Sequence, residues 1–90
     1  MEKGEVSLHQ LKVYLFARDK GSWVTAREIA EGAGVADRTA RHHALTLVKL
    51  GVFDQAEVFP AHRYRYSEKA NKRNKAYMLR LEGAREAFGV

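Results

Sequence analysis

Apolar residues recur every three or four positions over most of the chain, and this period predicts helices rather than strands. The spacing predicts helices over residues 7–20, 25–33 and 36–50. Ser7 is a suitable N-cap for the first helix, because its side-chain oxygen can accept a backbone hydrogen bond. This helix is apolar on most sides, so we expect other elements, and in part a second subunit, to cover it.

The second and third predicted helices begin differently. Thr25 and Glu28 have the spacing of a capping box, in which each side chain bonds the backbone N–H of the other residue. Gly32 and Gly34 are expected to end the second helix and turn the chain. Ala36 stands where Ser or Thr would normally cap the third helix, so its start is predicted to lack a side-chain cap.

The pattern changes to alternation in the second half of the chain, which predicts a β-hairpin over residues 52–66. Residues 59–61 are its expected tip, and residues 22–24 are long enough only for one edge strand. Side chains of the hairpin alternate between a tyrosine face, expected to meet the core, and an arginine face: Tyr64 and Tyr66 against Arg63 and Arg65.

The last predicted helix spans residues 68–88, where apolar positions recur in alternating steps of four and three. Such a seam is typical of helices that pair along their length. Together with the first helix it predicts a homodimer interface made of Leu8, Tyr14, Ala70, Asn74, Tyr77, Met78, Leu81, Ala84 and Phe88. The alternative is that the seam packs on the first helix of its own chain.

These elements predict a single domain over residues 1–90 of the α+β class, mainly α, with a three-helix core, a hairpin and an additional C-terminal helix. The sequence has no apolar run near the ~18 residues of a membrane span, and its first ten residues do not resemble a signal peptide. The absence of cysteine excludes disulfides, thiolate catalysis and cysteine-bound metals. We therefore expect a cytoplasmic protein without a membrane partner.

The net charge of +5 is unevenly distributed. Residues 1–35 carry five Lys/Arg and five Asp/Glu, whereas residues 36–80 carry ten Lys/Arg and four Asp/Glu. The positive excess therefore lies in the third helix, the hairpin and the start of the last helix. Such a distribution favours a polyanionic partner, although a solvated basic surface is the simpler alternative.

The sequence predicts no catalytic site and no metal-binding site. The sequence contains no glycine-rich phosphate loop and no Ser-His-Asp spacing, so we expect no enzyme, no cofactor and no small-molecule ligand. His42 and His43 are adjacent and diverge by about 100° on a helix, so they cannot share one metal ion as an i,i+4 pair can. His43 is expected to pack toward the core and His42 to face outward.

Residues of the second and third helices resemble the pattern T-x-x-E-I-A…G-V-s-x-x-T-v-R…L…G-L of winged helix-turn-helix proteins. The resemblance covers roughly residues 22–67. Over this range the sequence is similar to bacterial and archaeal repressors of the MarR-like, ArsR-like and GntR-like groups. The matching residues are Thr25, Glu28-Ile29-Ala30, Gly34-Val35, Thr39, Arg41, Leu47 and Gly51-Val52. The order of predicted elements agrees with that fold.

The resemblance implies a double-stranded DNA partner, with residues 36–50 as the recognition helix in the major groove and residues 52–66 as the wing. The residues implied to contact DNA are Thr25, Arg27, Ala36, Asp37, Arg38, Thr39, Arg41, His42, Thr46, Arg63 and Arg65. Arg38 is implied to read a guanine, because a guanidinium can bond O6 and N7 together. Thr25 and Arg27 are implied to meet phosphate, and the wing arginines the backbone or minor groove.

The function implied by the resemblance is a small homodimeric transcriptional repressor that reads an inverted repeat. Two alternatives stay open at this point. One is a replication or partition protein of a mobile element, which would bind DNA with the same surfaces. The other is a winged helix that serves as a protein-interaction module, with exposed apolar residues such as Leu45 as its contact.

Overall fold

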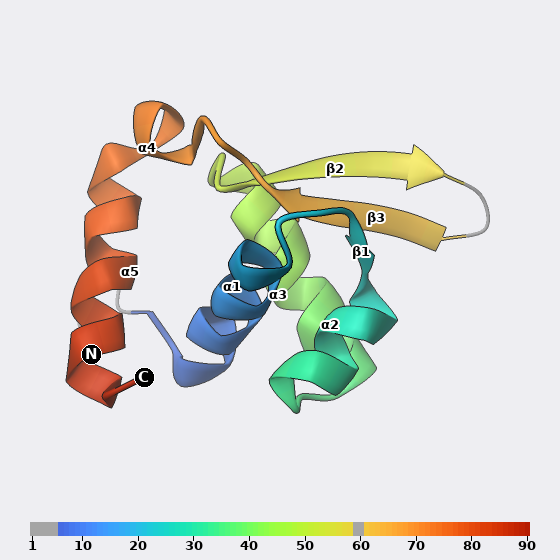
Figure 1. Ribbon diagram of the computed structural model, residues 1–90, viewed down its shortest axis with the longest axis horizontal. Coiled ribbons are helices and arrows are strands. Elements are labelled where there is room, and N and C mark those ends of the chain that lie inside the picture. Colours follow the sequence, from blue (N-terminus) through green and yellow to red (C-terminus); the bar gives the residue numbers. More distant parts are fainter. Residues whose placement is uncertain (1–5, 59–60) are drawn as a thin grey trace.

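The computed structural model describes residues 6–58 and 61–90, and the predicted hairpin tip at residues 59 and 60 lies outside them. The described part is mainly helical with one small antiparallel sheet, as predicted (Figure 1). In chain order its elements are α1 (Leu8–Lys20), β1 (Val24–Thr25), α2 (Ala26–Ala33), α3 (Asp37–Lys49), β2 (Phe53–Val58), β3 (Ala61–Tyr66), α4 (Ala70–Arg73) and α5 (Lys75–Phe88).

Helices α1, α2 and α3 pack against one another, and α1 and α3 also contact the sheet. The predicted inward face of α3 is confirmed, because Ala40, Ala44 and Leu47 are fully buried. Leu11 of α1 and Ile29 of α2 complete the centre of this core. Since two of the α3 residues are alanines, the neighbouring helices can approach α3 closely.

The helix ends follow the predicted capping chemistry at four places. Ser7 accepts a hydrogen bond from the backbone N–H of Gln10, and Thr25 and Glu28 form the predicted capping box. Ala36 occupies the N-cap position of α3 without any side-chain hydrogen bond. Gly34 ends α2 in the left-handed conformation, with φ 73°.

The expectation that Gly32 also helps to end α2 is wrong. Gly32 lies inside α2, and the ring of Phe16 from α1 occupies the space that a side chain at this position would fill. The glycine therefore allows a close helix contact rather than a turn. This contact brings one edge of α1, a helix with apolar residues on several sides, directly onto α2.

The sheet has the strand order β1-β3-β2, with all neighbours antiparallel. The predicted hairpin is present: β2 and β3 pair from Phe53↔Tyr66 to Val58↔Ala61. Tyr64 is only 2% exposed, and the ring of Tyr66 packs edge-on against Tyr14 with centroids 5.9 Å apart, so the predicted core face is confirmed. The edge strand begins at Val24 instead of Ser22.

The prediction of one continuous helix over residues 68–88 is wrong, because Asn74 divides it into α4 and α5. Asn74 has a non-helical backbone conformation, with φ −153° and ψ 70°, and its side chain caps α5 by accepting from the N–H of Tyr77 at 3.2 Å. The same amide donates to the carbonyl of Leu50 at 3.0 Å. Asn74 therefore fixes the junction against the end of α3 and is not part of a pairing seam.

The predicted dimer seam also requires correction, because most of its side chains are buried within one chain. Figure 1 shows α5 standing beside α1 at one end of the molecule, and the two helices are in contact. The seam residues with 6% exposure or less are Tyr14, Ala70, Tyr77, Met78 and Leu81. Leu8 and Ala84 are half-buried, and Phe88 is exposed. The cover of α1 thus comes from its own chain.

Among the described residues, no helix has the length and apolar character to cross a membrane.

Candidate nucleic-acid interface

Helix α3 presents a polar face to solvent on the side opposite its buried alanines. Arg38, Arg41 and His42 are exposed on this face, with Leu45 at its centre at 37% exposure. Neither Arg38 nor Arg41 forms an ion pair with a residue in the described part of the chain. Both guanidinium groups are therefore available to an external acceptor.

The exposed face of α3 borders a cleft of about 620 Å³, named here the α3 cleft. Its walls come from the start of α2, from α3 between Asp37 and Leu45, and from one face of the hairpin. The cleft is lined by Thr25, Ala26, Arg27, Asp37, Arg41, Leu45, Gln55, Ala61, His62 and Tyr64. The fold thus brings together Thr25, Arg27, Asp37 and Arg41, which the sequence had only implied to share a surface.

Tyr64 forms part of the cleft wall and links the hairpin to α3. Burial raises the pKa of the Tyr64 phenol, while the nearby charge of Arg41 and a hydrogen bond with Gln55 act in the opposite direction. The phenol therefore stays protonated at neutral pH. Arg41 of α3 and Gln55 of β2 line the same cleft as Tyr64.

The start of α2 offers a backbone donor to this cleft. The capping box occupies the N–H groups of Thr25 and Glu28, at 2.8 and 3.2 Å. The N–H group of Arg27 lies in the first turn of α2 and has no acceptor within the helix. Arg27 reaches Glu31 at 3.5 Å, but both side chains are at least 70% exposed, so this ion pair holds Arg27 only weakly.

The paired histidines separate as predicted. The Nδ1 atom of His43 lies 3.1 Å from Oε1 of Gln10, and the side chain is half-buried, whereas His42 is exposed. Burial lowers the pKa of His43, and the neighbouring imidazoles of His42 and His9 lower it further. No three His, Asp or Glu side chains within residues 6–58 and 61–90 are grouped as a metal site would require.

Comparisons of structure identify the fold. The chain superposes on the ST1889 protein of the archaeon Sulfolobus tokodaii with a TM-score of 0.69 and 16% identity, covering 94% of this chain and 85% of that one. It also superposes on a MarR-family transcriptional regulator of Rhodococcus sp. RHA1, with a TM-score of 0.65, 13% identity and coverage of 92% and 60%. The fold is a winged helix. The hairpin of β2 and β3 is its wing.

A third similar winged-helix structure is BpsR of Bordetella bronchiseptica, whose DNA binding is regulated by 6-hydroxynicotinic acid. Its TM-score is 0.68 at 10% identity, with coverage of 97% of this chain and 63% of that one. This chain therefore spans less than two thirds of the two bacterial proteins. No protein-family model and no curated protein matches the sequence.

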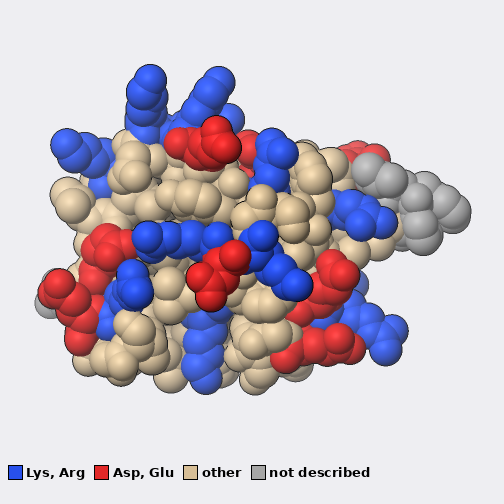
Figure 2. All heavy atoms as spheres, in the orientation of Figure 1, with Lys and Arg blue, Asp and Glu red and all other residues tan. Residues whose placement is uncertain are grey.

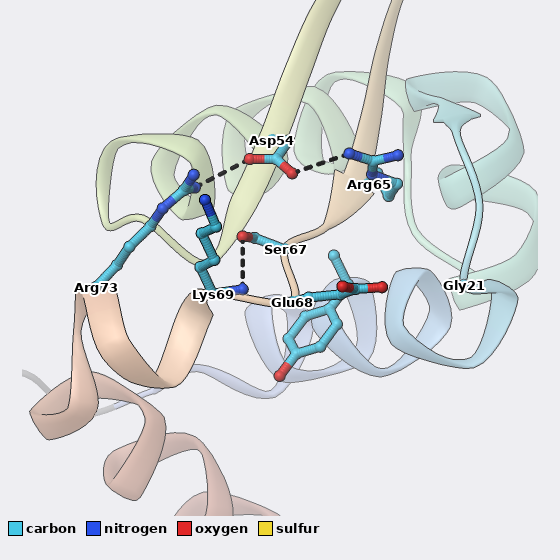
Figure 3. Close-up of a pocket in the computed structure, with 8 residues that line it drawn as sticks. Gly21, Asp54, Arg65, Ser67, Glu68, Lys69 and Arg73 are labelled. Carbon is cyan, nitrogen blue, oxygen red and sulfur yellow. Dashed lines mark hydrogen bonds and ion pairs between the residues drawn. The ribbon is translucent and has the colours of Figure 1, made fainter.

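The wing arginines do not line the α3 cleft. Successive residues of a strand point to opposite faces, and Gln55, His62 and Tyr64 occupy the face toward α3. Arg65 lies on the other face, where it pairs with Asp54 at 3.3 Å (Figure 3) and stacks 4.3 Å from the ring of Trp23. Arg63 shares the face of Arg65 but pairs in register with Thr25, at the edge of the cleft.

Six residues that line the α3 cleft were not predicted to contact DNA: Ala26, Leu45, Gln55, Ala61, His62 and Tyr64. Leu45 lies four residues after Arg41 and seven after Arg38, so helical periodicity alone places it on the same face. Gln55 and His62 share the face of Tyr64, which was interpreted only as a core face. Thr46 was predicted to contact DNA, but its hydroxyl donates a hydrogen bond to the carbonyl of His42 at 3.0 Å. The hydroxyl proton is therefore already used within α3.

Proposed function

We propose that this winged-helix protein binds double-stranded DNA sequence-specifically, with the exposed face of α3 in the major groove. The observation that carries this proposal is the α3 cleft, where unpaired Arg41, a backbone donor of α2 and polar wing residues share one concave surface. A major groove about 12 Å wide admits a helix with its side chains. Cationic and hydrogen-bonding groups on such a helix match phosphates at the rim and base edges at the floor.

Each side chain of the surface has a distinct proposed role. Arg38, exposed near the start of α3, hydrogen-bonds O6 and N7 of a guanine, and Arg41 contacts phosphate or base beside it. Leu45 provides an apolar contact for a thymine methyl group. Arg27 binds phosphate with its side chain and its backbone N–H group. Ala36, Asp37, Thr39 and His42 of α3 lie along the same contact, and Thr46 borders it.

The wing contributes through the face toward α3 and through its edge. His62 is exposed there, and Arg63 lies opposite Thr25, so both are proposed to contact the DNA backbone beside the major groove. Arg65 is excluded from this contact because Asp54 and Trp23 hold it on the outer face. The proposed wing contacts are therefore His62 and Arg63, in place of Arg63 and Arg65.

We propose further that the protein is a cytoplasmic transcriptional regulator that acts as a repressor. Structural similarity to a MarR-family regulator and to BpsR supports a regulatory role. The expected absence of a small-molecule effector has no support, because BpsR responds to 6-hydroxynicotinic acid. A role in replication or partition would use the same α3 contacts, and the identity of the selected DNA sites distinguishes the two.

We also propose a homodimer that pairs through the outward face of α5 instead of the buried seam. Leu79 is 64% exposed on this face, and Gly83 has only open space where a side chain would stand. Ala76 and Ala87 extend the same stripe of small apolar residues. An exposed apolar face on a terminal helix suits a two-fold interface, in which the same surface is used twice.

A two-fold dimer would read an inverted repeat with half-sites roughly 34 Å apart. Light scattering on two matched variants tests it: Leu79→Asp should reduce the mass to that of one chain, and Leu45→Asp should leave the mass unchanged. For DNA affinity the opposite is expected: Leu45→Asp should weaken binding and Leu79→Asp should affect it less, since only Leu45 lies in the α3 cleft. An unchanged mass for Leu79→Asp would contradict the proposed interface.

Selection of bound sequences from a random duplex pool tests the proposed function. We expect enrichment of a short inverted repeat, and binding that weakens steeply with salt because cations on the protein replace counterions on the DNA. Retention of no duplex at low salt would contradict DNA binding and favour a protein-interaction module. Binding without any enriched sequence would contradict sequence-specific reading.

A further inference from the structure

The face of the sheet opposite the α3 cleft carries a second group of basic side chains. Gln55 and Tyr64 line the α3 cleft, so their strand neighbours Asp54 and Arg65 point away from it. A second cavity of about 590 Å³ lies on this outer face, between the base of the wing and α4. It is lined by Gly21, Asp54, Arg65, Tyr66, Ser67, Glu68, Lys69 and Arg73 (Figure 3).

Asp54 orients two arginines at the mouth of this cavity. Its carboxylate accepts from Arg65 at 3.3 Å and from Arg73 at 2.9 Å. A guanidinium has five N–H donors, so each arginine keeps most of its donors after this contact. Two guanidinium groups held in place with free donors are suited to phosphate, which they bind in a bidentate manner.

Helix α4 adds lysines beside the two arginines. Lys69 lies one turn before Arg73, and Figure 3 shows both side chains rising from α4 toward Asp54. The start of α4 is fixed because the buried Ser67 accepts from the backbone N–H of Lys69 at 3.0 Å. Lys69 and Lys72 are exposed and form no ion pair with a described residue.

The outer basic surface is named here from Arg65, Lys69 and Arg73, which line this cavity, together with Lys72, which precedes Arg73 on α4. Figure 2 shows Lys and Arg side chains gathered at the end of the molecule where α4 lies. Two acids accompany the four cations, Asp54 and Glu68, so the surface retains a positive excess. This surface accounts for part of the positive charge that the α3 cleft does not use.

We propose that the outer basic surface binds the phosphate backbone of a second DNA duplex while the α3 cleft holds the first. The inference rests on the proposed function. A straight duplex seated in the α3 cleft has the sheet between itself and Arg65, so it does not reach the outer basic surface. Contacts made only to phosphate carry no sequence information, so the second duplex is bound irrespective of its sequence. The protein would then join two DNA segments.

A capture experiment tests this inference with the full chain. A biotinylated duplex carrying the selected site is immobilised and saturated with protein, and a fluorescent duplex of unrelated sequence is then added. The test variant is Lys69→Glu with Lys72→Glu. The control is Lys20→Glu with Arg85→Glu, which changes the net charge equally on α1 and α5. Circular dichroism and urea unfolding verify that both variants are folded, and fluorescence anisotropy gives their affinity for a single site duplex.

We expect wild type and control to capture the second duplex, and the Lys69/Lys72 variant to capture at least fivefold less. Its affinity for the single site duplex should change less than twofold. Capture by the variant equal to wild type would overturn the inference, because a second α3 of a dimer would then hold the second duplex. Wild type that binds the first duplex but captures no second one would overturn it and leave the proposed function intact. Failure to bind the first duplex would overturn both.

Discussion

The Nδ1 atom of His43 lies 3.1 Å from Oε1 of Gln10, and the same Gln10 amide donates its Nε2–H to the hydroxyl of Tyr77. One glutamine on α1 therefore connects α3 with α5. In this arrangement Gln10 Oε1 accepts a hydrogen bond from the Nδ1–H of His43, so the neutral imidazole carries its proton on that nitrogen. The connection joins the buried side of α3 to the terminal helix.

The lowered pKa of His43 makes the stability of the fold depend on pH. Below the ordinary value of 6.5 the unfolded chain binds a proton that the buried imidazole resists, so the free energy of unfolding falls as the pH decreases. The contribution is fully present above that value and is lost toward the folded pKa. Urea unfolding at about pH 7.5 and about pH 5.5 measures this loss of stability. One proton can change the free energy of unfolding by at most about 1.4 kcal/mol per pH unit.

His43→Gln should have a shallower pH dependence than wild type over this interval. His62→Gln removes an exposed imidazole of the wing and provides the matched control, which should retain the wild-type slope. Equal slopes for wild type and His43→Gln would show that the buried imidazole does not determine the acid response.

Asp54 should stabilise the protein at neutral pH and lose this effect in acid. Burial acts to raise the pKa of Asp54, but hydrogen bonds with Arg73 and Arg65 and their charges outweigh it, so the pKa is lowered. The contribution is therefore present above the ordinary value of 3.8 and is lost as the pH falls through the folded pKa. Because both arginines are 43% exposed, the two pairs together contribute only about 1 kcal/mol.

Asp54→Asn measures this contribution by urea unfolding. The variant should be less stable than wild type by about 1 kcal/mol near neutrality, with the difference vanishing in strong acid. Glu57→Gln, on the same strand and exposed, should have little effect at either pH. A difference that persisted unchanged in strong acid would exclude ion pairing as its cause.

Local signals predicted the helices well, because they reside in neighbouring residues. The capping box of Thr25 and Glu28 and the inward alanines of α3 depend only on spacing along one helix, and both are present. Alternation likewise separated Tyr64 from Arg65. What alternation could not supply was the side of the sheet on which α3 lies, so it did not show that Arg65 pairs with Asp54 on the face away from the α3 cleft.

The C-terminal helix shows the other limit of sequence interpretation. A heptad-like spacing from Ala70 to Phe88 describes an apolar stripe, but it does not state whether α1 or a second chain covers it. The break at Asn74 depends on the carbonyl of Leu50, which is distant in sequence. Such contacts are tertiary, and the polar residue that would set the register of a coiled coil is here a helix cap.

Ala36→Ser should stabilise α3. Ala36 has the extended backbone of an N-cap, with φ −68° and ψ 153°, but provides no side-chain acceptor. A serine oxygen would accept from a first-turn N–H and raise the free energy of unfolding by about 1 kcal/mol. Ala26→Ser is the matched control, since Thr25 already caps that helix and no gain is expected. Equal effects of the two substitutions on urea unfolding would contradict a missing cap at Ala36.

The most direct test of the proposed DNA contact is the affinity of Arg38→Ala for a selected duplex and for an unrelated duplex, measured by fluorescence anisotropy. Arg85→Ala, an exposed arginine of α5, is the control and should match wild type. If Arg38 reads a guanine, its loss should reduce the preference for the selected duplex by about 5- to 150-fold while the affinity for unrelated DNA changes little. A variant that bound the selected duplex as tightly and as selectively as wild type would contradict the placement of α3 in the major groove.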